Sequence, residues 1–373
     1  RREIEDDLIL ADAGRAVSSG DVETAPVLNI LDLGRRGFYR WRDVVARRTR
    51  NRLMAFLQFD MDHTYEMFDE ISFERFCDEA SLPEELRVSF RTFARAFFSN
   101  ESDLSTADVL RAFHFYYLGH DEGLLYDYPT DDYESSLLAP IRAHLEEHGV
   151  DIRTEARVGA VERGAERRFR LDGEEYDWLV IAADIPGARA IAGASGWLRD
   201  VDPDFVKGLE QLETSNGYAV WRIWVDKDVR SSLPTFINVE RKRLLDSVTL
   251  YHRITREASD WASKNAGAVL ELHSYALPPD LQSESEVRTV FMEELEGYFP
   301  ELRDLRIAAE ALQVRHDFPA FAPLQQRWRP STETGIEGLL MAGDWIRLPY
   351  PMTHMEAAFT SGVLCANRVF EDL

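Results

Sequence analysis

The residues with the clearest chemical potential lie near the end of the chain. An apolar run at residues 339–342 predicts a short buried strand. Gly343 follows it and would let the backbone approach a ligand that a side chain would block. Asp344 then lies just beyond the carboxyl end of a strand, where open α/β sheets bind ligands. This order predicts a ligand-binding turn; an ordinary strand–turn–helix with a surface aspartate is the alternative.

A helix is expected directly after this turn. Pro349 and Pro351 exclude a helix from the turn itself. Thr353 and Glu356 have the T-x-x-E spacing of a capping box, which predicts that the helix begins there. The free N–H groups and the positive dipole end of such a helix would face an anion in the crevice.

Composition limits the partners and the location of the protein. The chain has 373 residues, 45% of them hydrophobic, which is enough for one large domain or two ordinary ones. A net charge of −24 argues against nucleic acid as a partner. The sequence contains no run of 18 apolar residues, so no transmembrane helix is predicted. Residues 1–7 are charged and do not resemble a signal peptide. Cys77 and Cys365 are expected to be reduced core residues of a cytoplasmic protein, and no metal site is predicted.

The hydrophobic pattern divides the chain into regions of different secondary structure. Residues 1–30 are expected to be irregular, and residues 27–113 are expected to be helical. The other predicted elements are a helix at 137–148 closed by Gly149, strands at 150–152, 157–161, 168–171 and 178–184, a β-rich region at 217–280, a helix at 283–299 and a strand at 311–316.

The C-terminal segment resembles a known cofactor motif. Ala342-Gly343-Asp344 followed by a helix with the pattern M-E-x-A-x-x-S-G is similar to the C-terminal FAD motif of the flavin amine oxidase and carotenoid desaturase superfamily. The resemblance implies that FAD is the cofactor and that Asp344 binds its ribityl–pyrophosphate part. It also places the backbone of Met355 and Glu356 near the flavin ring. The other cofactor-binding positions that it implies are Val158 at the adenine end, Ala183 beside the pyrophosphate, and Gly343, Trp345 and Ala358 within the motif.

The same resemblance implies an α/β (α+β) fold. It would combine a Rossmann-like FAD/NAD(P)-binding domain, incomplete at its N-terminus, with a substrate domain of mixed antiparallel sheet and helices. The expected domains are a helical substrate-side region at 1–135, part of the FAD-binding domain at 136–200, an antiparallel-sheet substrate domain at 201–330, and the C-terminal FAD-binding strand and helix at 331–373.

The first signature of the superfamily, G-x-G-x-x-G after a strand, does not occur in the sequence. The nearest pattern, Gly193-x-x-Gly196, has two glycines and no predicted strand before it. Either the numbered chain omits an N-terminal part of the protein, or it is a homologue that has lost FAD binding. We favour omission, because the other FAD features would have little reason to persist together.

The middle of the chain resembles one branch of this superfamily, the carotenoid ring desaturase/methyltransferases of the isorenieratene synthase type. The segments that carry this resemblance are 97–100, 113–119 with Gly123 and Leu124, 127–131, 138–142 and 180–188. The branch implies oxidation of an allylic C–C bond by FAD, with methyl migration on a β-ionone ring. It also implies a hydrophobic isoprenoid or carotenoid substrate and, since such substrates reside in membranes, peripheral membrane contact.

Two further sets of side chains are candidates for the reaction. Aromatic faces could line a substrate tunnel and stabilise a cation. The tunnel candidates are Phe113, Tyr116, Tyr117, Trp221, Trp224 and Tyr251, with packing in the core as the alternative. The candidates for a base that removes a proton are Asp127, Glu271, His273 and His354, with a structural role as the alternative for each.

Two other functions remain open from the sequence. One is a flavin amine oxidase that acts on a soluble amine, against which the hydrophobic middle region argues. The other is a relic without FAD that binds a carotenoid or a partner, and the missing glycine motif is its main support.

Overall fold

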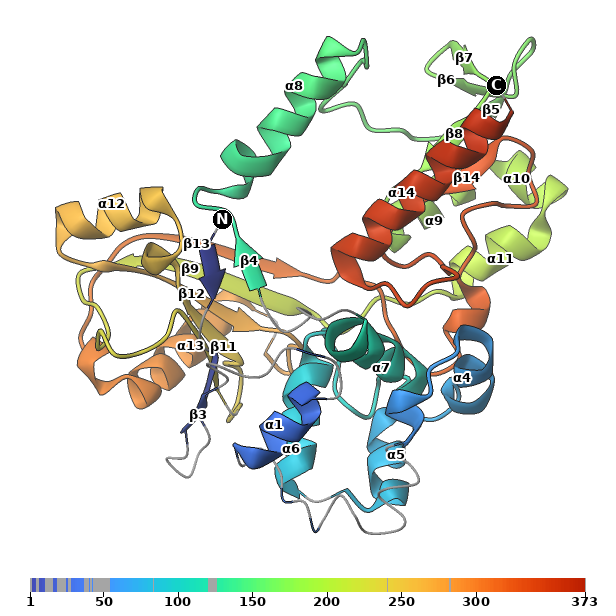
Figure 1. Cartoon of the computed structure of the whole chain (residues 1–373). Coiled ribbons are helices and arrows are strands. Elements are labelled where there is room, and N and C mark those ends of the chain that lie inside the picture. Colours follow the sequence, from blue (N-terminus) through green and yellow to red (C-terminus); the bar gives the residue numbers. More distant parts are fainter. Residues whose placement is uncertain are drawn as a thin grey trace.

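The computed structural model describes residues 2–4, 7–10, 16–18, 25, 28–36, 40, 42 and 54–372, the last range without residues 83, 120–125, 240 and 282 (Figure 1). Gly123 and Leu124, which carry part of the resemblance, therefore lie outside the described residues. In the described part of the chain, no helix has both the length and the apolar character that are needed to cross a membrane. Cys77 and Cys365 are buried and free, as predicted.

The N-terminal third is helical around an aromatic core, as the hydrophobic pattern predicted. Its helices are α1 (Leu28–Arg35), α4 (Met61–Phe68), α5 (Phe73–Ala80), α6 (Glu84–Arg95) and α7 (Thr106–Phe113), and the π-helical turn η1 (His114–Leu118) extends α7. Asp60 and Ser72 cap α4 and α5, because their side chains accept hydrogen bonds from backbone N–H groups three residues ahead. Phe73, Phe76 and Phe97 are fully buried between these helices.

A seven-stranded sheet forms the second part of the molecule. Its order is β13 (Ile307–Arg315), β9 (Tyr218–Val225), β12 (Ala268–Ser274), β11 (Ser247–Leu250), β10 (Phe236–Val239), β2 (Asp7–Leu10) and β3 (Ala16–Ser18). Side chains of β9 alternate between the two faces, so Trp221 and Ile223 are buried on one of them. Helix α13 (Glu284–Tyr298) packs on this face, where Phe291 stacks on Trp221 at 6.2 Å between ring centroids.

The expectation that residues 1–30 are irregular is wrong for three short segments. Strands β2 and β3 extend the sheet, and β1 (Arg2–Ile4) pairs with β4 (Tyr126–Tyr128). Strand β2 pairs in parallel with β10, so Leu8 lies opposite Ile237. The local pattern could not indicate the pairing of β1 with β4 or of β2 with β10, because these partners lie far away in the sequence.

The FAD-domain part of the chain contains the predicted parallel strands. They are β8 (Leu179–Ile181) and β14 (Leu339–Met341), which pair with each other. Around them lie α9 (Ile185–Ala194), α10 (Gly196–Val201), α11 (Pro203–Gln211) and the C-terminal helix α14 (His354–Glu371) (Figure 1). The small sheet β5 (Glu162–Arg163), β6 (Phe169–Leu171) and β7 (Glu174–Tyr176) lies beside this pair.

The strands predicted at 150–152 and 157–161 do not form. This segment is extended and exposed along its length until Val161, and no described strand lies next to it to complete a ladder. The predicted helix before it does form, as the π-helical turn η2 (Glu134–Leu138) and helix α8 (Ala139–Glu147). Gly149 follows with φ +80°, the left-handed conformation that ends helices, as expected.

Helix α8 projects away from the other elements, and α14 lies across from it on the far side of the connecting segment (Figure 1). Both helices expose apolar side chains. On α14, Met355, Phe359 and Phe370 are 63%, 76% and 72% exposed. The apolar residues exposed on η2, on α8 and just after it are Leu137, Leu138, Ile141, Leu145, Val150 and Ile152. These two apolar faces are large for a protein surface, which indicates that they contact a partner or another segment.

Candidate cofactor site

The candidate site lies where β8 and β14 end. Trp345 follows β14, and its indole Nε1 donates a hydrogen bond to the carbonyl of Ala183, just after β8, at 3.1 Å. Trp345 is 1% exposed and packs in the core around the two strands. The indole therefore holds the two strand ends together, and the expected contact of Trp345 with the cofactor stays a prediction.

Gly343 is required at the turn by its backbone conformation and by its neighbour. Its φ is +149°, and a Cβ atom there would lie 2.8 Å from Nε1 of Trp345. Its N–H donates to Oγ of Ser361 at 2.9 Å, and that oxygen lies 2.7 Å from the carbonyl of Ala358. Ser361 therefore fixes helix α14 against the turn, and Ala358 contributes through its backbone.

Asp344 is half-buried at the same turn, in the position that the sequence predicts. Burial raises the pKa of its carboxyl group, while the charges of Arg329 and Arg111 oppose this rise. A partly desolvated carboxylate of this kind gains from hydrogen-bond donors such as ligand hydroxyl groups.

Helix α14 begins where the sequence predicts, with Thr353 as the N-cap residue. The capping box itself is only half confirmed, because the Thr353 side chain accepts no hydrogen bond from the first turn of the helix. Met355 and Glu356 are exposed, and the N-terminal N–H groups of the helix carry its positive dipole end. His354 has φ +51°, a strained value for a residue with a side chain.

His354 belongs to an aromatic layer that the sequence only partly predicts. Its ring lies 5.1 Å from Phe97 and 5.7 Å from Phe318, measured between centroids. Phe318 in turn lies 4.1 Å from Phe98, which lies 4.6 Å from Tyr218 of β9. Burial lowers the pKa of His354 to about 4, and the Arg111 charge lowers it further. The ring is therefore neutral at pH 7 and packs as an apolar group.

Phe98 has φ +53°, which is unusual for a bulky residue. Strain of this kind persists only where the surrounding structure holds it, and it is common at functional sites. Phe97 and Phe98 belong to a segment that resembles the carotenoid branch, and no other sequence pattern predicts their place in this layer. Phe318 and Tyr218 carried no signal, since their partners come from distant segments.

Glu271 and His273 lie on the open face of the sheet and contact each other. Nε2 of His273 is 3.1 Å from Oε1 of Glu271, and Nε of Arg222 donates to Oε2 at 2.7 Å. Burial alone would raise the pKa of Glu271, but His273 and Arg222 outweigh it and lower the pKa. Tyr251 lies under the Arg222 guanidinium at 3.7 Å from ring centroid to Cζ. Glu271 is thus a paired carboxylate and a weak proton acceptor.

The six tunnel candidates are divided among three places. Phe113, Tyr116 and Tyr117 lie together, since Tyr117 stacks on Phe113 at 4.6 Å and Phe93 contacts both tyrosines. Burial raises the pKa of Tyr116, and the Thr353 side chain opposes this rise, which places Tyr116 near the start of α14.

The remaining tunnel candidates lie on or beside the sheet. Trp224 and Tyr251 are partly exposed on the open side of β9, whereas Trp221 points to the other face and donates to Oε2 of Glu310 at 2.7 Å. The expected role of Trp221 is therefore corrected to the core, because residues 221 and 224 face opposite sides of a strand.

Two other candidates lie outside this cluster. Asp127 is exposed in β4, opposite Glu3 of β1. Val158 is 37% exposed in the extended segment before β5. Nothing in the described residues brings either of them to the turn at Asp344.

A buried charge cluster lies beneath the aromatic layer, and the sequence analysis missed it. Asp108 of α7 is fully buried and accepts hydrogen bonds from the Tyr65 hydroxyl at 2.6 Å and from Nη1 of Arg329 at 3.2 Å. Nη2 of Arg111 lies 2.9 Å from the same Asp108 oxygen. The spacing D-x-x-R in a helix was the available signal, because it places both side chains on one face.

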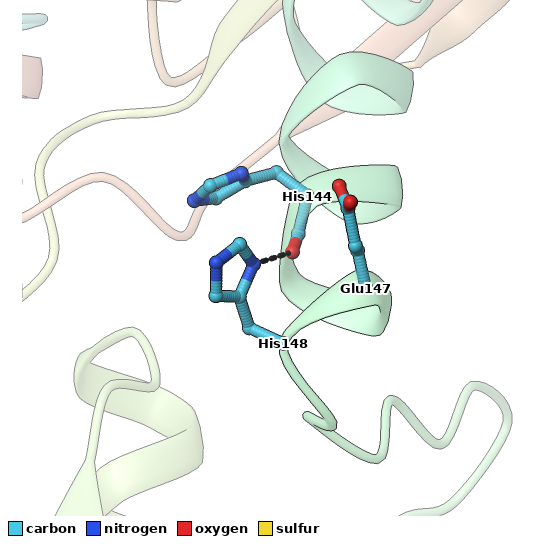
Figure 2. Close-up of side chains that lie close together, drawn as sticks. All are labelled: His144, Glu147 and His148. Atoms are coloured by element: carbon cyan, nitrogen blue, oxygen red, sulfur yellow. Dashed lines mark hydrogen bonds between the residues drawn. The ribbon is translucent and has the colours of Figure 1, made fainter.

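One group of potential metal ligands occurs in the described residues, on the exposed helix α8 and its C-cap. One ligand atom of each of His144, Glu147 and His148 lies within 4.8 Å of the others (Figure 2). Nδ1 of His148 is hydrogen-bonded to the carbonyl of His144 at 2.8 Å. This group lies on a projecting helix, apart from strands β8 and β14 (Figure 1).

Comparison with known proteins assigns the family. Residues 15–370 match the family model described as flavin containing amine oxidoreductase, so the chain belongs to this family. A relative named carotenoid phi-ring synthase, from Streptomyces griseus, is 33% identical over 323 residues, which cover 85% of this chain and 62% of the relative. A relative of the same name from Chlorobaculum tepidum is 24% identical, over 85% of this chain and 67% of the relative. The chain thus spans about three-fifths of the length of the Streptomyces relative.

Solved structures agree on the fold. Wild-type putrescine oxidase bound to putrescine aligns with a TM-score of 0.67 at 12% identity, over 100% of this chain and 82% of that chain. At this identity the likeness establishes a shared α/β fold of the FAD-oxidase kind, in agreement with the fold class that the sequence predicts.

Family membership makes FAD the cofactor, and the described residues fit its flavin end. Gly343 allows the tight turn against the Trp345 indole, Asp344 offers a carboxylate there, and Ser361 of α14 is hydrogen-bonded to the Gly343 N–H. The sequence contains no G-x-G-x-x-G loop for the pyrophosphate. The described residues therefore fit the flavin and ribityl groups of FAD. They include no glycine-rich loop that would hold its phosphates.

Proposed function

We propose that the chain is part of an FAD-dependent oxidoreductase that acts on a carotenoid, by desaturation and ring aromatisation with methyl migration. The turn at Gly343 and Asp344, held beside the start of α14, carries this proposal. Its support is the family match together with two relatives named carotenoid phi-ring synthase. When bound, FAD would accept two electrons from an allylic C–C bond of the substrate.

The chain's own residues would bind both molecules. Asp344 would accept hydrogen bonds from the ribityl hydroxyl groups, and the N-terminus of α14 would face the flavin ring. The aromatic layer of Phe98, Phe318 and Tyr218 would contact the apolar polyene and exclude water. Of the four candidate bases, His354 is the one in this layer, but its lowered pKa makes it a weak proton acceptor, so its neutral ring would contact the substrate as an apolar group.

The exposed apolar faces of α8 and α14 are part of the proposal. We infer that they pack against a strand–glycine-loop–helix segment that holds the phosphates of FAD, because such a segment would cover Ile141 and Leu145 on one side and Phe359 on the other. Supplying this segment from a relative, fused or co-expressed, should raise the FAD content of the purified protein. An unchanged FAD content would contradict this part of the proposal.

Peripheral membrane contact follows from the substrate, which resides in lipid. Flotation with liposomes that contain β-carotene is the measurement. We expect co-flotation with the vesicles and none without them. Protein that stays at the bottom of the gradient would remove membrane contact from the proposal.

The central experiment compares Asp344→Asn with Asp184→Asn, a matched change at the end of the neighbouring strand. We expect Asp344→Asn to weaken FAD binding by about 10- to 100-fold, since a hydrogen bond to a charged group contributes about 1.5–3 kcal/mol. Asp184 caps α9 through the Gly187 N–H at 2.7 Å, so its variant should bind FAD normally.

Product analysis in a host that makes β-carotene then tests the substrate class. New aromatic-ring carotenoids, with loss of the product in Asp344→Asn, are the expected result. Hydrogen peroxide on addition of amines, without any carotenoid product, would favour a flavin amine oxidase instead. A wild-type protein that does not bind FAD even when the glycine-loop segment is supplied would contradict both functions.

A further inference from the structure

Arg111 is a buried cation with unsatisfied hydrogen-bond donors. It is 3% exposed, and its Nε and Nη2 atoms have no hydrogen-bond acceptor among the described residues. Nη2 lies 2.9 Å from Oδ1 of Asp108, yet it is not aligned with that oxygen as a hydrogen bond requires. A buried charged donor without an acceptor costs several kcal/mol, so proteins rarely keep one without a function.

The nearest carboxylate is already in use. Nη1 and Nη2 of Arg329 donate to Asp108, at 3.2 and 3.4 Å, and the Tyr65 hydroxyl donates to it at 2.6 Å. Arg329 also donates to Oε1 of Gln326 and to the carbonyl of Ala320. Arg329 is therefore satisfied by the protein, whereas Arg111 shares Asp108 as a second cation and keeps free donors.

The surroundings of Arg111 place it at the candidate flavin position. Its guanidinium lies 5.3 Å from the ring centroid of Phe321, which contacts Phe97 at 5.6 Å, and Phe97 contacts His354 at 5.1 Å. The Arg111 charge lowers the pKa of both Asp344 and His354, the two groups at the turn and at the start of α14. The substrate class of the proposed function is uncharged, so the cofactor is the source of an anion here.

We propose that Arg111 contacts the flavin ring of FAD and stabilises the negative charge that the ring gains on reduction. This proposal rests on the proposed function, since it needs FAD at the turn. The N-terminus of α14 would act on the same charge from the other side. Asp108 would hold the guanidinium in place without cancelling its charge, because Arg329 already occupies that carboxylate.

The test is the midpoint potential of bound FAD in Arg111→Met, in Arg111→Lys and in Arg95→Met as the control. The Arg95 side chain is 16% exposed, against 4% for Arg111, and it pairs with Asp246 at 3.0 Å. Arg111, and not Arg95, is among the main charges that shift the pKa of Asp344 and His354. We expect Arg111→Met to lower the affinity for reduced relative to oxidised FAD at least about tenfold. This corresponds to a drop of about 30 mV for a two-electron couple. Arg111→Lys keeps the positive charge, so its midpoint potential should stay close to that of the wild type.

Each outcome has a distinct meaning. An unchanged potential in an FAD-loaded Arg111→Met protein would overturn the proposal and leave the proposed function intact. Equal loss of affinity for oxidised and reduced FAD would also overturn it, since that result indicates contact with the phosphates. If Arg111→Met does not fold, the uncharged variant Arg111→Gln takes its place, and a midpoint potential equal to that of the wild type in Arg111→Gln overturns the proposal. A wild type that binds no FAD even when the glycine-loop segment is supplied would contradict the proposed function and this inference together.

Discussion

Nε1 of Trp345 donates to the carbonyl of Ala183 at 3.1 Å, and this bond joins the ends of the two parallel strands beside the backbone bond from Ala342 N–H to the Ile181 carbonyl at 3.0 Å. The two residues are distant in the sequence, yet they position the turn at Asp344. The indole thus supports the site from the core side without facing the cofactor.

Replacing Trp345 with Phe should therefore affect both stability and cofactor binding. The change leaves the Ala183 carbonyl without its partner, which should cost about 1–3 kcal/mol in the free energy of unfolding. Trp197→Phe is the matched control, because Nε1 of Trp197 donates to the carbonyl of Val161 at 2.8 Å in the same core. Urea unfolding and FAD titration should show similar destabilisation in both variants, but weaker FAD binding only in Trp345→Phe. Equal FAD affinity in the two variants would contradict the role of the bond.

A second prediction concerns Gly343. The change Gly343→Ala would place a Cβ atom 2.8 Å from Nε1 of Trp345, in a backbone conformation that alanine rarely adopts. We expect a loss of about 1–3 kcal/mol in thermal or urea unfolding. Gly362→Ala is the control within α14, because no atom lies within 4 Å of its Cβ position and alanine favours a helix by up to about 1 kcal/mol. Destabilisation of the same size in both variants would argue against the clash.

A third prediction concerns acid stability. Burial lowers the folded-state pKa of His354 to about 4, so the unfolded chain binds its proton first as the pH falls. The stability from this group is present above pH 6.5 and is lost as the pH falls from 6.5 towards 4, by at most about 3 kcal/mol. His354→Asn removes the titration, and asparagine tolerates φ +51° better than most residues. Unfolding curves between pH 4 and pH 8 should show a smaller acid loss in the variant, and parallel pH profiles would refute the assignment.

A fourth prediction concerns the histidine pair on and beside α8. The carbonyl of His144 can only accept, so Nδ1 of His148 must carry the proton, and its Nε2 keeps a lone pair for a metal ion. Added Zn²⁺ or Ni²⁺ should bind to the purified protein in titration calorimetry. His148→Ala should weaken this binding at least about tenfold, while Glu146→Gln, a change of the neighbouring carboxylate outside the cluster, should not. Binding that is equal in the wild type and His148→Ala would exclude the pair as the site.

Much of the fold could be predicted because it depends on local patterns. Strands β8 and β14 are apolar runs bounded by turn residues, and α13 follows a capping serine at Ser283. The strands expected at 150–152 and 157–161 had the right pattern, but a strand needs a neighbour, and no described segment supplies one. Whether an apolar segment finds a neighbouring strand depends on the whole structure, so the sequence alone could not show that these two strands do not form.

The candidate site divides in the same way. Gly343 and Asp344 follow a strand in the sequence, so their place at its end was predictable. The contact of Phe98 with Tyr218 and the pairing of Asp108 with Arg329 join distant segments. Trp221 was expected to line the tunnel but is buried in the core. The sequence does not show which face of a strand an aromatic residue occupies until the partner elements are known.

Strand β2 has a consequence for how the protein folds. Leu8 lies opposite Ile237, so β2 cannot take its place in the sheet until the much later residues of β10 have been synthesised. Pairing at such sequence separation slows folding, and the waiting segment exposes an unpaired apolar strand meanwhile. The yield of soluble protein should therefore depend on how this early segment is protected during synthesis, for example by a chaperone.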